Sequence, residues 1–146
     1  MAQFNAENYL GIFLYGSQNY GLDYEGSDID MIAIVLTAPK PRYNVTIPTG
    51  KMKVYTLKYF LHRLQLGDLE CYEILYTPYH LVNPIHSTAW EVFVEDVSNT
   101  ICYSRVQYSL LKKLDEHINH ILWMPSAKDG AKYNRKRLYW ALRVCN

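Results

Sequence analysis

Leu14-Tyr-Gly-Ser-Gln-Asn-Tyr-Gly-Leu-Asp-Tyr-Glu-Gly-Ser-Asp-Ile-Asp-Met-Ile-Ala-Ile-Val35 is the stretch that decides the predicted fold. An apolar run ends in Gly16-Ser17, a turn-rich segment follows, and Asp28 and Asp30 then open a second apolar run. Because successive side chains of a strand alternate between its two faces, Asp28 and Asp30 are expected to point the same way. The stretch therefore predicts two strands joined by a loop, with polar groups gathered where the strands meet that loop.

These polar groups predict a metal and phosphate site. Two neighbouring carboxylates repel each other unless a cation lies between them. Their hard oxygen atoms suit Mg²⁺, which is usually bound by one or two protein carboxylates together with water and phosphate oxygens. Gly16 and Ser17 precede a short helix expected over residues 18–21, where backbone N–H groups and a hydroxyl can bind the same phosphates. We therefore expect Mg²⁺ or Mn²⁺ as the cofactor.

Length and composition indicate one ordinary globular domain. The chain has 146 residues, of which 49% are hydrophobic, and this is enough to bury a core. Its three cysteines are widely spaced and form no Cys-x-x-Cys motif, which predicts a reducing compartment and neither a disulfide framework nor a zinc site. The N-terminal residues have no basic segment followed by a long apolar run, so no signal peptide or membrane partner is expected. We therefore expect a cytoplasmic location.

Charge is unevenly distributed, although the net charge is only +1. Residues 1–36 contain five acidic residues and no Lys or Arg, whereas residues 101–146 contain nine basic residues and three acidic ones. An acidic half that binds metal, opposite a basic half, fits a substrate that bears phosphates. Lys132 and Lys136 are the basic residues expected to contact a triphosphate or RNA, and a solvated helix face is the alternative for both.

The first part of the chain combines strand patterns with helical ones. Four segments have the alternation or the short apolar run of a strand: residues 9–15, 29–36, 43–47 and 51–57. The last two are expected to form a hairpin. Two later segments have helical spacing, residues 59–66 and 68–75, and Asp68 is expected to cap the second helix.

The second part of the chain is predicted to be helical. Residues 79–87 are expected to form an extended connection, and helices are expected at 89–97, 104–122 and 131–144. This order predicts an α+β fold, in which a mixed sheet has helices on one face and a C-terminal helical part follows. We expect a single domain over residues 1–146, with the sheet in residues 1–78 and the helical part in residues 79–146.

The motif around the aspartates suggests a family. Ten residues separate Gly16-Ser17 from Asp28-Ile29-Asp30, and this pattern resembles the DNA polymerase beta-like nucleotidyltransferase superfamily. The longer forms Gly16-Ser-Gln-Asn-Tyr-Gly21 and Ser27-Asp-Ile-Asp30 are similar to a branch of predicted nucleotidyltransferases that includes RNA-ligase-associated and phage proteins. Residues 67–75 and 136–143 are similar to two later helices of that branch, Gly-Asn-Pro-x-x-x-Glu-x-Leu and His-x-x-Arg.

The resemblance implies a nucleotidyltransferase-like five-stranded mixed sheet and a reaction. A nucleotide would pass from a nucleoside triphosphate to a hydroxyl of RNA, a protein or a small molecule, with two metal ions stabilising the entering and leaving oxygens. Asp28 and Asp30 would be the catalytic metal ligands. Gly16 and Ser17 would hold the β- and γ-phosphates, and Tyr20 and Ser27 would belong to the same nucleotide site.

The chain departs from the family pattern at the third carboxylate. Active members usually place this group on a later strand, but residues 51–57, Lys-Met-Lys-Val-Tyr-Thr-Leu, contain no acid. Lys53 is expected to bind a phosphate there, and Glu70 or Glu73 is the alternative source of a third carboxylate. The missing acid supports a second reading of the function, namely an inactive relative that binds or sequesters a nucleotide or acts as a regulatory or antitoxin module.

The late helix also departs from the family. Tyr139 or Trp140 stands where a histidine is usual, and relatives generally continue beyond the point at which this chain ends. A truncated chain and a reduced natural form would both have this appearance.

Overall fold

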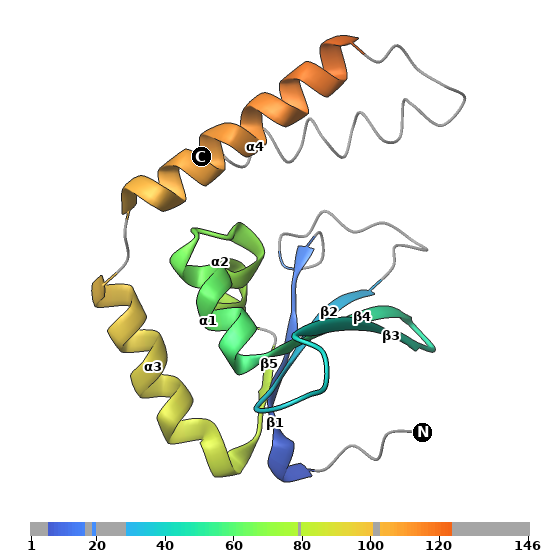
Figure 1. The fold of residues 1–146 in the computed structure, drawn as a ribbon, viewed down its shortest axis with the longest axis vertical. Coiled ribbons are helices and arrows are strands. Elements are labelled where there is room, and N and C mark those ends of the chain that lie inside the picture. The colour runs from blue at the N-terminus through green and yellow to red at the C-terminus, as the bar shows by residue number, and fades with distance from the viewer. Residues whose placement is uncertain (1–5, 17–18, 20–28, 79, 101–102, 124–146) are drawn as a thin grey trace. The chain divides into compact units, whose positions relative to one another are not determined.

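The computed structural model describes residues 6–16, 19, 29–78, 80–100 and 103–123. The chain divides into two compact units, Met1–Cys102 and Tyr103–Asn146. The described residues of the first unit form a five-stranded sheet and three α-helices, and the described part of the second unit is one long helix, α4 (Tyr103–Trp123). The fold is therefore α+β with a mixed sheet, as expected (Figure 1).

The sheet has the order β3-β4-β2-β1-β5. Its strands are β1 (Tyr9–Leu14), β2 (Ile29–Val35), β3 (Arg42–Ile47), β4 (Gly50–Thr56) and β5 (His80–Val82). Strands β2 and β4 are parallel and the other neighbours are antiparallel. The four longer strands and the β3–β4 hairpin confirm the sequence-based expectation.

Strand β5 corrects the expectation of an extended connection over residues 79–87. Its three residues pair with β1, so that Gly11 is opposite Val82 and Phe13 is opposite His80. The buried side chain of Asn83 fixes the exit from this strand, because Nδ2 donates to the Tyr9 carbonyl over 3.0 Å. A 3-10 turn, η3 (Pro84–His86), then leads into α3 (Ser87–Thr100).

Helices α1 (Leu57–Gln65) and α2 (Leu69–Tyr76) follow the hairpin directly. The Thr56 hydroxyl caps α1 by accepting from the Tyr59 N–H, and the Asp68 carboxylate caps α2 by accepting from the Cys71 N–H. Such caps satisfy backbone donors that the first turn of a helix leaves without partners. The cap predicted at Asp68 is confirmed.

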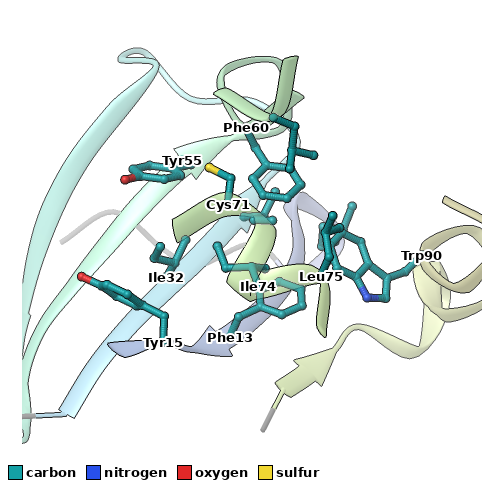
Figure 2. Packing of buried hydrophobic residues seen from close by; sticks show 12 residues of the cluster. Phe13, Tyr15, Ile32, Tyr55, Phe60, Cys71, Ile74, Leu75 and Trp90 are labelled. Carbon is teal, nitrogen blue, oxygen red and sulfur yellow. The ribbon is translucent and has the colours of Figure 1, made fainter. Parts of the chain in front are cut away.

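One large hydrophobic cluster joins one face of the sheet to α1, α2 and α3. Its fully buried members include Phe13 and Ile32 from the sheet, Phe60 from α1 and Ile74 from α2. Trp90 of α3 completes it, with its ring centroid 4.8 Å from that of Phe13. Figure 2 shows these side chains together, with the hydroxyl groups of Tyr15 and Tyr55 pointing away from Trp90.

The other face of the sheet has a separate, smaller cluster. Its buried members are Ala33 and Val35 from β2 and Met52 and Val54 from β4. Among the residues described in the first unit, the α-helices thus pack on one face of the sheet. In the described part of the chain, no helix combines the length and the apolar character needed to cross a bilayer.

Candidate functional site

Gly16 and Asp30 lie side by side at the end of the helix-covered face of the sheet. The Tyr15 N–H donates to the Asp30 carbonyl over 3.1 Å, which places the residues after β1 beside the start of β2. Gly16 has φ +80°, and a Cβ built on it would lie 3.2 Å from Asp30 Oδ2. A glycine is therefore favoured here for two reasons, the left-handed backbone and the close approach of a carboxylate.

Helix α2 brings a second carboxylate to the same place. Glu73 Oε2 accepts a hydrogen bond from the backbone N–H of Gly16 over 3.4 Å. Gly16 therefore touches Glu73 through its N–H, and its Cα faces Asp30. Of the two alternatives named from the sequence for an additional carboxylate, Glu73 is the one that contacts the Gly16 backbone.

Lys51, Lys53 and Tyr55 hold the positions on β4 where the resemblance implies an acid. In the parallel pairing of β2 and β4, Asp30 is opposite Lys51 and Ile32 is opposite Lys53. Lys53 Nζ lies 2.8 Å from Glu70 Oε2 and 4.8 Å from the centroid of the Tyr15 ring. The lysine thus forms an ion pair with α2 and a cation–π contact with the residue that follows β1.

Ionisation of the groups around Lys53 reflects this arrangement. Burial would lower the pKa of Lys53, but hydrogen bonds to Glu70 and Tyr15 and the negative charge of Glu70 raise it above its ordinary value. Burial raises the pKa of Tyr15, and the nearby Lys53 opposes this change. Burial also raises the pKa of Tyr55, with a further contribution from Glu70. At neutral pH, Lys53 is therefore positively charged, and the phenols of Tyr15 and Tyr55 are neutral.

The start of α2 is fixed by Asp68. One oxygen, Oδ1, accepts from the Cys71 N–H over 3.2 Å, while the other, Oδ2, accepts from Arg63 Nε over 2.8 Å. Glu70 and Glu73 follow at three-residue spacing, which places them on one side of the helix. Asp68 therefore sets the position of the two carboxylates that contact Lys53 and Gly16.

The donor groups present fit a hard divalent cation. Asp30 and Glu73 both lie against Gly16, and Mg²⁺ is usually bound by one or two protein carboxylates together with several water ligands. Across the described ranges, no group of three or more His, Cys, Asp or Glu residues is placed to hold a metal ion. The described part of the site thus offers carboxylates for one such ion and no larger metal cluster.

Several residues predicted from the sequence lie outside the described residues. They are Ser17, Tyr20, Ser27 and Asp28 near the front motif and Lys132 and Lys136 near the C-terminus. The remaining three, Gly16, Asp30 and Lys53, are described. Asp30 lies against Gly16 and accepts from the Tyr15 N–H, and the ammonium group of Lys53 lies over the Tyr15 ring. Tyr15 was not singled out from the sequence as a site residue, because an aromatic residue at a strand end is usually part of the core.

Comparison with known proteins adds no family assignment. No protein-family model matches this chain, and no curated protein matches it either.

Proposed function

We propose that the chain is a metal-dependent nucleotidyltransferase that moves a nucleotide from a nucleoside triphosphate to a hydroxyl of RNA, a protein or a small molecule. The single observation that supports the proposal is the approach of the Gly16 backbone to the Asp30 carboxylate. It brings a backbone N–H that can bind phosphate and a carboxylate that can bind metal to one point, although thirteen residues lie between them in the sequence.

Each residue has a distinct role in this proposal. The Gly16 N–H and the Ser17 hydroxyl hold the β- and γ-phosphates, and Asp28 and Asp30 bind Mg²⁺ or Mn²⁺. When bound, the metal ion supplies positive charge that stabilises the oxygens of the reacting phosphate. Tyr20 and Ser27 line the nucleotide.

A second function is favoured by the environment of Lys53. Strand β4, where the resemblance implies an acid, contains none, and its Lys53 is paired with Glu70. A protein without this acid can bind a metal–nucleotide complex without completing the transfer. It would then act as a nucleotide-binding regulatory module, such as a sequestering protein or an antitoxin.

Label transfer separates the two functions. The purified protein is incubated with each nucleoside triphosphate labelled at the α-phosphate, with Mg²⁺ or Mn²⁺, and with an RNA and protein extract. The enzyme hypothesis requires label on an acceptor, and this label must disappear when Asp28→Ala and Asp30→Ala are combined. Nucleotide binding without transfer under both metals would support the regulatory module instead.

A matched control removes two acidic residues elsewhere. Glu91 and Glu95 are exposed on α3, and neither belongs to the proposed site. The combined variant Glu91→Ala, Glu95→Ala has the same change in net charge and should keep full transfer and binding. If the wild-type protein binds no nucleoside triphosphate with either metal, both functions are wrong.

A further inference from the structure

Residues 31–67 contain six Lys and Arg residues and no Asp or Glu. The stretch includes most of β2, the β3–β4 hairpin and α1, and all of it is described. Lys53 is paired with Glu70. Arg63 is paired with Asp68. Among the described residues, the other four cations form no ion pair with an acid, and all are exposed: Lys40, Arg42, Lys51 and Lys58.

The strand register places Arg42 and Lys51 on the helix-covered face of the sheet. Residues directly opposite each other on antiparallel strands share a face. Arg42 is opposite Tyr55, whose side chain belongs to the hydrophobic cluster beneath the helices. Lys51 precedes Tyr55 by four residues on β4, and this even spacing gives it the same face. Asn44 and Thr46 follow Arg42 at every second position of β3, so they share this face, and both are exposed.

Lys40 and Lys58 lie beyond the Arg42 end of this row. The Pro41 carbonyl accepts a hydrogen bond over 2.9 Å from the N–H of the residue before α1. This bond holds the neighbours of Pro41 beside the start of α1, where Lys58 is the second residue. Between the strand positions of Arg42 and Lys51 the row is about 13 Å long, at ~3.3 Å per residue. We call the surface made by these six residues the basic strip: Lys40, Arg42, Asn44, Thr46, Lys51 and Lys58.

The side chains of the basic strip fit the backbone of a single-stranded RNA. Lys and Arg bind phosphates without regard to base sequence. Asn44 and Thr46 lie between cations and offer an amide and a hydroxyl that can bond to a ribose 2′-hydroxyl, the group that distinguishes RNA from DNA. Strand β4 is also paired with β2, so the hairpin is not a free two-stranded ribbon that could enter the major groove of a duplex.

We propose that the basic strip binds the phosphate backbone of a single-stranded RNA. The strip contains none of the residues of the proposed nucleotide site, so this binding does not depend on that site. Its Lys51 end is opposite Asp30 in the register of β2 and β4. An RNA along the strip would therefore pass beside the strand that carries Asp30. If the proposed function holds, on which this consequence rests, the acceptor is RNA and not a protein or a small molecule.

Fluorescence anisotropy of a labelled oligouridine tests the proposal with a chelator present and without a nucleoside triphosphate. The affinity is measured over a range of KCl concentrations. For a single strand, each phosphate contact contributes about −0.7 to the slope of log affinity against log salt, so four cations predict a slope of about −2.8. Combining Arg42→Gln with Lys51→Gln should change the slope to about −1.4 and weaken binding roughly twentyfold at ~0.1 M salt.

A second pair of variants keeps the test independent of the folding of the first. Lys40→Gln combined with Lys58→Gln removes two cations outside the strands and should change the slope by the same amount. Circular dichroism establishes that both double variants are folded.

Helix α4 provides a matched control. Arg105 and Lys112 are exposed there, and Arg105→Gln combined with Lys112→Gln removes the same charge as the variants of the strip. This control should keep the slope and the affinity of wild type. An oligodeoxyuridine of the same length should bind wild type more weakly than the oligouridine does, because it lacks the 2′-hydroxyl.

Four results would overturn the proposal. The first is no binding of oligouridine by the wild-type protein, and the second is an equal loss in the α4 control, which would assign the binding to net charge. Equal binding of oligodeoxyuridine would remove the assignment to RNA, and equal binding of polyglutamate would identify an acidic protein as the partner. None of these measurements involves label transfer, so failure of the proposed function would leave the basic strip standing.

Discussion

Glu73 on α2 accepts a hydrogen bond from the backbone N–H of Gly16, 57 residues earlier in the chain. The Glu73 carboxylate is therefore bonded to the N–H group that is expected to bind phosphate. At 3.4 Å the bond is long, and long hydrogen bonds are weak. A phosphate oxygen that approaches Gly16 must consequently displace a group of the same charge.

This contact predicts that Glu73→Gln strengthens the binding of a nucleoside triphosphate in the absence of metal. Removing the negative charge lowers the repulsion between residue 73 and the phosphates, and we expect a gain of about tenfold. Equilibrium binding of a fluorescent nucleotide in the presence of a chelator measures the effect. Glu91→Gln, an exposed change of equal charge on α3, should not alter the affinity. Unchanged or weaker binding by Glu73→Gln would contradict the prediction.

Gly16→Ala should weaken nucleotide binding and also destabilise the fold. The residue has φ +80°, which costs a non-glycine residue about 1 kcal/mol, and the new Cβ would press on Asp30. Gly67, with φ 78° after α1, provides the control because Gly67→Ala introduces similar backbone strain. Urea denaturation should show a loss of stability for both variants, while calorimetry should show a loss of affinity for Gly16→Ala alone. Equal affinities for the two variants would mean that Gly16 matters only for the fold.

Asp68 should contribute to stability through both of its carboxylate oxygens. Asp68→Ala removes the cap of α2 and the partner of Arg63, and we expect a loss of about 1–2 kcal/mol in the free energy of unfolding. Asp68→Asn keeps a capping oxygen but loses the charge, so its cost should be smaller. Chemical denaturation of the three proteins measures the difference. The prediction is wrong if Asn and Ala cost the same.

Alkaline pH should destabilise the protein, and Tyr55 should account for part of the effect. The pKa of Tyr55 is raised in the folded state by burial and by Glu70, whereas an unfolded tyrosine loses its proton near about pH 10. Above that pH the unfolded state releases a proton that the folded state keeps, so the free energy of unfolding falls as pH rises. The raised pKa values of Tyr15 and Lys53 act in the same direction.

Comparison of Tyr55→Phe with wild type tests this assignment. The free energy of unfolding is measured by urea denaturation from about pH 8 to about pH 11, a range that brackets the unfolded pKa. The variant should lose less stability over this range than wild type does. Tyr43→Phe changes an exposed tyrosine on β3 and should follow the wild-type curve. If both variants follow the wild-type curve, another group is responsible.

The sequence predicted the parts of the fold that are encoded locally. The alternation in residues 43–47 and 51–57 and the turn between them gave the β3–β4 hairpin, and Asp68 marked the start of α2. Strand β5 escaped prediction because three residues are too few for an alternating pattern, and its strand partner β1 lies far back in the sequence. Only the tertiary fold makes His80–Val82 a strand.

The sequence predicted the two segments that meet in the candidate site, but not the ion pair beside them. Gly16 and Asp30 were linked by a motif whose spacing can be read directly, and the structure brings them together. The pair between Lys53 and Glu70 depends on the angle at which α2 returns over the sheet, which no local pattern encodes. The three-residue spacing of Glu70 and Glu73 after a capping aspartate is the one signal that pointed to this side of the helix.

The pairing of β1 with β5 has a consequence for synthesis of the chain. During translation, β2, β3 and β4 can assemble with β1 once residue 56 has left the ribosome, whereas the outer edge of β1 finds its partner only after residue 82 has emerged. Until then the outer edge of β1 exposes unpaired backbone groups, and its apolar residues favour pairing with other chains. We therefore expect nascent chains that end before β5 to aggregate more than chains that include Asn83, because its side chain fastens β5 beside Tyr9.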